Sequence, residues 1–247
     1  MRRTAAAVAE AQSFDRVAVD LDRLSELNRD RDDLITTWLV GLLPAAARYA
    51  IDLGCGPGRH AVLLAGRFEQ VDAVDLSGPM IELARARRPR PNISYLHGDL
   101  QQAGQAGHYD LVLCVRTLHH VPDLPAALSH LKRLVAPGGR LVVVDSYPPA
   151  AGPGPARRML HRAVPLRPRL HALALQALAA NLIRRGPRTA WEIYRLSTRR
   201  EWLDHRVSDR FFTREELVRC CDTLFPGYRL DVLGGPRGLG LVWDLSY

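Results

Sequence analysis

Lysine is nearly absent from this chain of 247 residues, although its net charge is +8. Lys132 is the one lysine, so 33 of the 34 basic residues are arginine. The arginines are dispersed along the chain, and no basic motif interleaved with aromatic residues, as in RNA-binding modules, accompanies them. We therefore attribute the charge to a codon-composition bias, as in a high-GC bacterium, and expect no nucleic-acid partner.

Cysteine is also scarce, and the spacing of the four cysteines is typical of neither disulfide bonding nor metal binding. Cys55, Cys114 and the adjacent Cys220 and Cys221 give no disulfide framework and no zinc-ligand pattern. This excludes a small disulfide-stapled domain and predicts that the protein holds no metal. It also fits a reducing cytoplasm. Glu10 interrupts the arginine- and alanine-rich start of the chain, so we expect no signal peptide.

The sequence has no hydrophobic run long enough to cross a bilayer. The best candidate, residues 170–183, lies between arginines and has 14 residues, whereas a spanning helix takes ~20. Three interpretations of this segment remain open: a helix packed on the body, a lid over a substrate, or a helix lying on a membrane surface. Any membrane contact would therefore be peripheral.

What the chain does contain is a glycine-rich loop after an apolar strand. The run Ile51-Asp52-Leu53-Gly54-Cys55-Gly56-Pro57-Gly58 passes through a carboxylate into glycine at every second position. Such a loop lets a bulky cofactor lie against bare backbone beside a helix N-terminus. Because Arg59 follows the third glycine, the spacing is not that of the dinucleotide fingerprint, G-x-G-x-x-G.

Two more carboxylates follow later strand-like runs. Asp75 ends the run 71–75, which places it 23 residues beyond Asp52, about the length of a crossover helix and a return strand. There it can accept hydrogen bonds from both ribose hydroxyls, or it can serve as a helix N-terminal charge partner. Asp99 follows the run 93–96, where it can accept from the exocyclic amine of adenine or act as a plain turn residue.

The wider pattern predicts an α/β fold. Residues 1–12 are expected to be loose and 15–43 helical, and residues 48–146 alternate strands and helices, which favours a doubly wound parallel sheet. Pro137-Gly138-Gly139 should end a helix. After a Pro/Gly-rich turn region and a helical insertion, Thr213 and Glu216 form a capping-box pattern. Residues 228–233 and 239–245 then indicate a closing β-hairpin.

The segments 52–58, 74–77, 98–99, 118–123 and 134–139, in this order, resemble the class I S-adenosylmethionine (SAM) dependent methyltransferases. Within them the chain looks most like the ubiquinone/menaquinone-biosynthesis and small-molecule branch. The resemblance implies a Rossmann-like, mostly parallel seven-stranded sheet with an antiparallel C-terminal hairpin strand. It also implies four parts: a helical cover (1–45), a SAM-binding core (46–146), a helical insertion or substrate lid (147–210), and a C-terminal helix and hairpin (211–247). In the cover, Leu21 stands where relatives often carry a tyrosine.

The resemblance also assigns residues to the cofactor. Asp52 and the glycine backbone would hold the methionine part, Asp75 the ribose and Asp99 the adenine edge, while Val115 would offer its carbonyl to the methionine ammonium. The full set implied is Asp52, Gly54, Cys55, Gly56, Gly58, Asp75, Leu76, Met80, Gly98, Asp99, Leu100 and Val115.

Three histidines are candidate general bases. His119 and His120 follow the fourth strand at the edge where an acceptor should lie, and His205 is a comparable candidate from the insertion. Proximity of the two substrates without any base is the alternative. Four aromatic residues are candidates for an acceptor pocket, although helical aromatics are more often core: Tyr147, Trp191, Tyr194 and Trp202.

These features together predict a cytoplasmic SAM-dependent methyltransferase. It would move a methyl group to an N, O or C atom of a small-molecule metabolite, such as a natural-product or quinone-like acceptor, and release S-adenosylhomocysteine (SAH). Two other interpretations stay open: a non-catalytic SAM-binding partner subunit, and an NAD-linked oxidoreductase, against which the closing hairpin counts. Both a monomer and a homodimer are compatible with the sequence.

Overall fold

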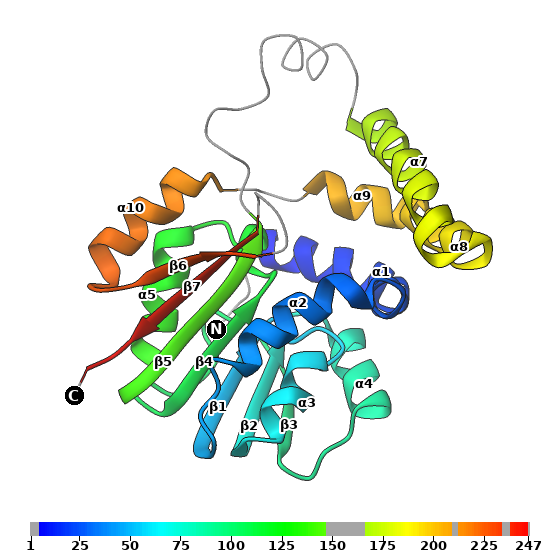
Figure 1. The fold of residues 1–247 in the computed structure, drawn as a ribbon. Coiled ribbons are helices and arrows are strands. Elements are labelled where there is room, and N and C mark those ends of the chain that lie inside the picture. Colours follow the sequence, from blue (N-terminus) through cyan, green and yellow to red (C-terminus); the bar gives the residue numbers. More distant parts are fainter. Residues whose placement is uncertain (1–4, 147–165, 209–211, 234–237, 247) are drawn as a thin grey trace.

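The computed structural model of the chain describes residues 5–146, 166–208, 212–233 and 238–246. Its centre is a seven-stranded sheet in the order β3-β2-β1-β4-β5-β7-β6 (Figure 1). Strands β1 to β5 pair in parallel, and β7 runs antiparallel to both β5 and β6. The predicted fold class is therefore confirmed. The strands are β1 (Ala47–Leu53), β2 (Phe68–Asp75), β3 (Ile93–His97), β4 (Tyr109–Val115), β5 (Val135–Ser146), β6 (Arg229–Val232) and β7 (Gly238–Asp244).

Helices cover both faces of the sheet, which is why its central strands are continuous apolar runs. One hydrophobic cluster joins the sheet to α5 (Leu124–Leu134) and α10 (Arg214–Leu224). A second cluster on the other face joins it to α2 (Arg29–Val40), α3 (Arg59–Ala65) and α4 (Gly78–Arg87). This doubly wound arrangement brings the carboxyl ends of β1 to β5 to one edge.

Side-chain caps fix where several helices begin. Ser77 accepts a hydrogen bond from the Met80 amide at 3.3 Å and so starts α4 beside the end of β2. Asp123 does the same for α5. The predicted capping box on α10 is confirmed, since Thr213 and Glu216 exchange bonds with each other's backbone amides at 3.2 and 2.7 Å.

The N-terminal expectation was wrong in one respect. Residues 5–12 are helical rather than loose, and the region predicted as helical holds two helices, α1 (Ala5–Leu27) and α2, which meet at Asn28. The start of α1 is ordered because Ala11 and Ser13 are buried, so tertiary packing supplies what local composition does not. The expectation for Pro137-Gly138-Gly139 needs refinement too: α5 ends at Leu134, and these residues belong to the start of β5, where its pairing with β4 shifts register.

The insertion contributes α7 (Leu166–Arg185), α8 (Pro187–Ser197) and α9 (Arg200–Ser208). Figure 1 places these helices beside α1, away from the sheet. A small apolar cluster joins Leu24 of α1 to Ile193 and Leu196 of α8, with Leu27 and Trp202 packed against it. The insertion therefore reaches the body through α1.

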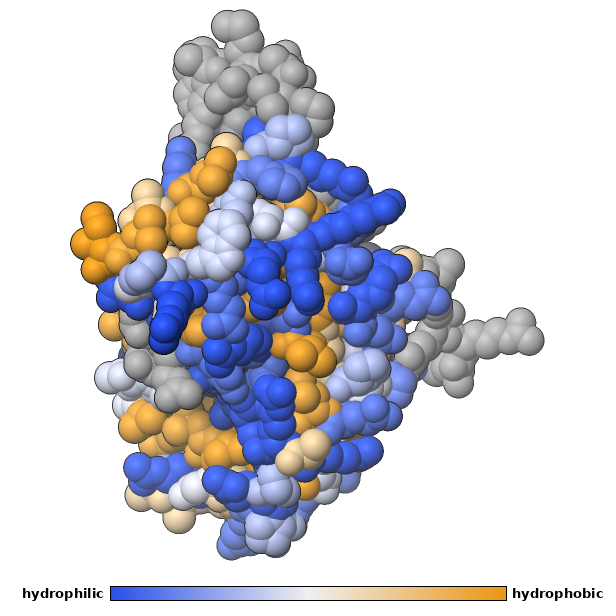
Figure 2. Space-filling view, turned by 90° about the vertical axis from the view of Figure 1, so that its right-hand side faces the viewer, coloured by the Kyte–Doolittle hydropathy of each residue, from blue (hydrophilic) through white to orange (hydrophobic). Residues whose placement is uncertain are grey.

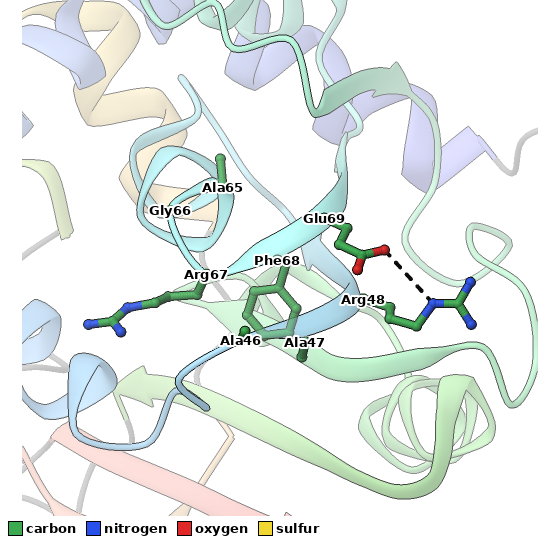
Figure 3. A pocket seen from close by; sticks show the side chains of 8 residues that line it. All are labelled: Ala46, Ala47, Arg48, Ala65, Gly66, Arg67, Phe68 and Glu69. Atoms are coloured by element: carbon green, nitrogen blue, oxygen red, sulfur yellow. Dashed lines mark ion pairs between the residues drawn. The ribbon is translucent and has the colours of Figure 1, made fainter.

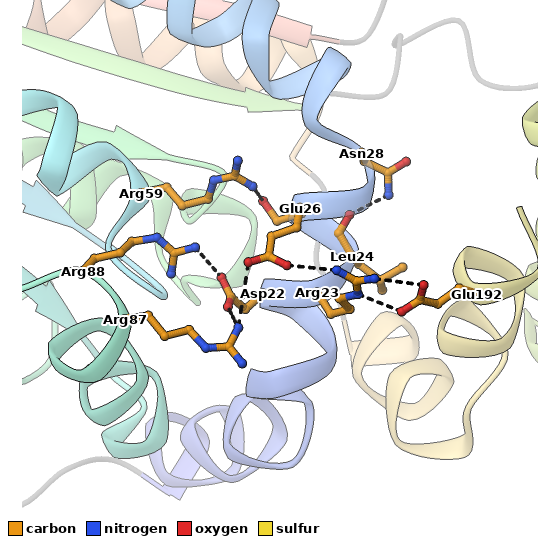
Figure 4. A network of polar contacts seen from close by, with 10 residues as sticks. Asp22, Arg23, Leu24, Glu26, Asn28, Arg59, Arg87, Arg88 and Glu192 are labelled. Carbon is orange, nitrogen blue, oxygen red and sulfur yellow. Dashed lines mark hydrogen bonds and ion pairs between the residues drawn. The ribbon is translucent and has the colours of Figure 1, made fainter. Parts of the chain in front are cut away.

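Helix α1 is tied to the core by a polar network (Figure 4). Asp22 is fully buried and accepts hydrogen bonds from Arg87 and from Arg88 Nη2, the latter at 2.9 Å. Arg59 donates to Ser25 Oγ at 2.6 Å, and Arg23 pairs with Glu192 of α8 at 2.7 Å. A pocket of about 240 Å³ lies among these residues, lined by Glu26, Arg59, Val62, Arg87, Arg88 and Arg90.

We predict that Asp22→Asn loosens α1 from α4, because the amide cannot compensate two guanidinium groups at a buried position. The free energy of unfolding should fall on the order of 3 kcal/mol, and hydrogen exchange of the α1 amides should accelerate selectively. Asp244→Asn is the control, since its pair with Arg140 at 2.5 Å is exposed and exposed pairs contribute little. Unchanged α1 protection in Asp22→Asn would show that the network does not hold the helix.

Candidate functional site

One surface depression can be set aside first. It measures about 390 Å³ and lies at the amino ends of β1 and β2, lined by residues 46–48 and 65–69 (Figure 3). Its charged pair, Arg48 and Glu69, stands 3.9 Å apart with both side chains largely exposed, at 69% and 72%. Ligands of open parallel sheets bind at the opposite, carboxyl edge. The polar groups of that edge are therefore the candidates.

Asp52, next to the last residue of β1, is a buried carboxylate in an unusual state. It is 1% exposed, and within the described residues neither carboxylate oxygen accepts a hydrogen bond of normal geometry. Burial and then the neighbouring Asp75 carboxylate raise the pKa of Asp52 to about 7, and the Ala61 backbone offsets only part of this rise. Burying a carboxyl group with so little hydrogen bonding is costly, which makes Asp52 a candidate for contact with a ligand.

Asp75, at the end of β2, has partners within the protein. Its Oδ2 accepts from the Gly56 amide at 2.7 Å, and its Oδ1 accepts from the Ser77 amide at 2.9 Å. Burial raises the pKa of Asp75, and these two amides counter part of the effect. The carboxylate thus holds the glycine loop in place through Gly56, a role that the sequence analysis missed, and its contact with Ser77 at the start of α4 fits the alternative of a helix N-terminal partner. Its remaining lone pairs are those available to a ribose.

The three loop glycines have left-handed backbone conformations, but they differ in surroundings. A Cβ at Gly54 would lie 2.1 Å from Thr117 Oγ1, and one at Gly58 would lie 2.7 Å from Tyr95 Oη. At Gly56, with φ +51°, a Cβ would meet nothing within 4 Å. Gly54 and Gly58 are therefore required for packing inside the protein, whereas Gly56 presents bare backbone to open space.

The other residues assigned to the cofactor differ in their burial and in their hydrogen bonds within the protein. Asp99 caps a turn, accepting from the Gln101 amide at 2.9 Å, as its turn interpretation predicted. The Val115 carbonyl already accepts from Thr117 Oγ1 at 3.0 Å. Gly98 donates to the Asp75 carbonyl at 2.9 Å. Met80 and Cys55 are buried, while two residues are partly exposed, Leu76 and Leu100.

The structure brings the three candidate histidines together. His119 and His120 lie in a short 3₁₀ helix after β4 (Leu118–His120), and their ring centroids are 3.9 Å apart. The ring of His205 from α9 lies 5.4 Å from that of His120. Phe14 of α1 packs edge-on between His120 and His205 at 4.7 and 4.5 Å.

His119 is oriented by a carboxylate. Asp145, 2% exposed at the end of β5, places Oδ1 2.7 Å from His119 Nδ1, and its Oδ2 accepts from the His119 amide at 3.1 Å. This contact fixes the ring and favours the tautomer with a proton on Nδ1. The other ring nitrogen, Nε2, is then the basic one.

His120 and His205 have different environments. Nδ1 of His120 lies 2.9 Å from Glu10 Oε1, an ion-pair distance, and Ser13 Oγ is 3.1 Å from His205 Nδ1. Burial, followed by the charge of His120, lowers the pKa of His205 to about 4. Because His205 is neutral and only weakly basic at neutral pH, it is the least suited of the three as a proton acceptor. The 2.7 Å contact with the buried Asp145 makes His119 the histidine whose ring is most firmly oriented.

Several residues of this site escaped the sequence analysis. Asp145 carried a usable signal, since it is a carboxylate at the end of a fifth strand, as Asp52 and Asp75 are of the first two. Glu10, Ser13 and Phe14 carried none, because their roles depend on where α1 crosses the sheet edge.

The aromatic candidates are dispersed. Trp202 packs near the histidines, with its ring 5.7 Å from that of His205. Trp191 and Tyr194 stack on each other at 5.5 Å on α8, and Trp191 is largely exposed. Tyr147 lies outside the described residues. Across the described ranges, no group of three potential metal ligands occurs and no helix is long and apolar enough to cross a membrane.

Residues 51–143 match the family model described as a methyltransferase domain. Over 114 residues the chain is 39% identical to an uncharacterized methyltransferase of Mycobacterium tuberculosis, which covers 45% of this chain and 57% of that protein. Over 107 residues it is 33% identical to a ubiquinone biosynthesis O-methyltransferase of Albidiferax ferrireducens, covering 41% and 42%. The chain thus spans about half the length of the curated relatives it matches.

Solved structures share the fold over nearly the whole chain. A putative S-adenosyl-L-methionine-dependent methyltransferase from Methanococcus maripaludis gives a TM-score of 0.60 at 18% identity, covering 94% of each chain. The DhpI–SAH complex gives 0.61 at 17% identity, covering 99% of each. Residues 51–143 are thus similar in sequence to a methyltransferase domain, in agreement with the resemblance that the motifs predicted.

We predict that Asp52→Asn changes stability in a pH-dependent way. The pKa of Asp52 is the ordinary 3.8 in the unfolded chain and about 7 in the folded protein. Between these values the folded state binds the extra proton, so the contribution of Asp52 to stability falls as pH rises. The free energy of unfolding of Asp52→Asn, relative to that of the wild type, should rise by about 2–3 kcal/mol between pH 5 and pH 8. Urea unfolding at the two pH values measures this difference. A pH-independent difference between the two proteins would contradict the burial of this charge.

Proposed function

We propose that this protein is a catalytically active SAM-dependent methyltransferase of the cytoplasm that acts on a small-molecule acceptor. The methyl would pass to an N, O or C atom of that acceptor, and SAH would be released. The matching relatives include a ubiquinone biosynthesis O-methyltransferase and a trans-aconitate 2-methyltransferase, both of which are named for small-molecule chemistry.

The observation that carries the proposal is the pairing of an unsatisfied carboxylate with an open backbone face. Asp52 is buried and accepts no hydrogen bond of normal geometry from the described residues, and Gly56, three residues beyond the end of β1, faces open space. A cationic ammonium near Asp52 would restore its pKa toward the ordinary value. Asp75 lies across the same loop and can accept from ribose hydroxyls. These residues fit a sulfonium nucleoside that carries an amino-acid tail.

SAM, when bound, supplies an activated methyl on a sulfonium sulfur, so the protein need not generate the electrophile. The carboxyl edge then has to orient the acceptor and exclude water. Phe14 and the rings of His120 and His205, which pack together, would form one wall of the acceptor site. His119, whose Nδ1 is held by Asp145, takes the proton at Nε2 when the attacking atom carries one. Trp202 and the insertion, predicted as a lid, would border the acceptor.

We predict that Gly56→Ala weakens SAH binding about tenfold or more, because its methyl enters the space assigned to the cofactor. Gly107→Ala is a matched control: Gly107 also has a positive φ of +66° and open surroundings, but it lies in the loop before β4, at the opposite edge of the sheet. Both variants should lose roughly 1–2 kcal/mol from backbone strain. Isothermal titration with SAH separates the two effects.

Equal SAH affinities in the two glycine variants would remove Gly56 from the site. Titration of the wild type with SAH and NADH tests the class of protein itself, since micromolar NADH binding without SAH binding would indicate an oxidoreductase. SAH binding with no labelled product, after incubation with radiolabelled SAM and a bacterial metabolite extract, would identify a non-catalytic partner subunit.

We predict that Asp145→Asn lowers kcat for labelled methyl transfer about 10²-fold or more, because an asparagine no longer selects the required His119 tautomer. KM for SAM should change little, and the limb of the pH–rate profile that reports the base should shift. Asp110→Asn serves as a control, since Asp110 binds backbone amides at the far end of β4. An unaltered pH–rate profile in Asp145→Asn would indicate that methyl transfer uses no general base at His119 and depends only on holding the two substrates close together.

A further inference from the structure

The outer face of α7 is apolar and exposed. Five residues spaced at i, i+3, i+7, i+10 and i+11 fall within roughly 100° around the helix axis. All five are exposed, and Ile183 is exposed to 90%. We call them the α7 outer face: Ala172, Leu175, Ala179, Leu182 and Ile183.

Helix α7 packs against α8 and α9 only along a narrow stripe, and Leu173, outside the outer face, is 53% exposed. Within the described part of the helix, Ala174 is the one buried residue, with Leu170 and Leu178 partly exposed beside it. Helix α7 ends at Gly186, whose φ of +79° lets the chain turn back into α8. Figure 1 shows the α7–α8 hairpin at the margin of the molecule, farther from the sheet than α1. The hairpin is therefore held from one side, and the α7 outer face contributes nothing to the core.

The charged residues of α7 itself are all arginines, of which Arg167 is paired with Asp204 of α9. Between Leu166 and Arg185 there are four arginines and no acidic residue. Arg184 is exposed beside Ile183, and Arg188 is exposed at the start of α8. Figure 2, which views this side of the molecule, shows a hydrophobic group next to a broad hydrophilic region. An apolar stripe between cationic ends is the pattern of a helix that lies in the interface of a bilayer.

We propose that the α7 outer face docks on an anionic phospholipid surface, with the helix parallel to the membrane plane. Leu175, Leu182 and Ile183 would enter the boundary between headgroups and acyl chains. The exposed Arg184 and Arg188 would contact phosphates. A second copy of the chain fits less well, because pairing two α7 faces would bring arginines against arginines with no acidic side chain on the helix to offset them.

The adjoining helix is consistent with this docking. Trp191 of α8 is 59% exposed, and an indole ring is favoured at the level of lipid headgroups. Helix α9, which follows, carries Trp202 and His205 at the proposed acceptor site. Docking itself requires no methyl transfer, so it stands or falls independently of the proposed function.

The test is co-sedimentation of the full chain with vesicles of phosphatidylglycerol and phosphatidylcholine, and with phosphatidylcholine vesicles alone. We expect binding to the anionic vesicles that weakens at 1 M salt, where screening removes the arginine contribution. Leu182→Glu/Ile183→Glu should reduce the partition coefficient at least about tenfold. Val232→Glu is the matched control, because Val232 is 63% exposed on β6 and belongs to no such face.

SAH titration checks that the double variant remains folded, and it keeps a failure of docking distinct from a failure of the proposed function. Absence of binding to anionic vesicles would overturn the docking proposal, as would equal binding by the double variant and wild type, or equal binding to both kinds of vesicle. A dimer in sedimentation velocity that the double variant converts to a monomer would also overturn it, since a second copy would then cover the face.

Discussion

The structure depends on the burial of a parallel sheet on both faces. Because α5 and α10 cover one face and α2, α3 and α4 cover the other, polar groups can remain only at the strand ends. Asp52, Asp75 and Asp145 occupy three of these ends at one edge. Asp75 and Asp145 are satisfied by amides or a histidine, whereas Asp52 has no such partner in the described chain. Asp52 is thus the carboxylate of the site with the least stabilisation from the protein, and it lies beside the bare backbone of the glycine loop.

Helix α1 links this edge to the rest of the molecule. At one end it is held by the buried contact of Asp22 with Arg87 and Arg88. Farther toward its start, Asp15 accepts from the Ser77 hydroxyl at 2.6 Å, at the end of β2, and Phe14 packs among the histidines. The insertion in turn packs on α1. A change at the α1–α4 contact would therefore reach the cofactor loop, the histidines and the insertion together.

Local sequence patterns predicted the elements that local physics controls. The glycine at every second position after β1, the capping box at Thr213 and the closing hairpin each depend on residues close in sequence, and each formed as expected. The prediction failed where burial arises from distant parts of the chain. Residues 5–12 look loose by composition, yet they are helical because α1 packs across the sheet edge. Likewise, nothing near Glu10 indicates that it would lie beside His120.

The sequence by itself determined the order of strands and helices, the bareness of the loop and the presence of carboxylates at strand ends, because each is encoded by neighbouring residues. Only the tertiary structure decided what those groups meet. In the folded chain Asp75 accepts a hydrogen bond from the Gly56 amide, and Asp145 at the end of β5 contacts His119 after β4. Asp52 accepts no hydrogen bond of normal geometry from the described residues, and the apolar face of α7 is exposed. Burial and pairing are properties of assembled surfaces, and a linear pattern does not contain the neighbours that set them.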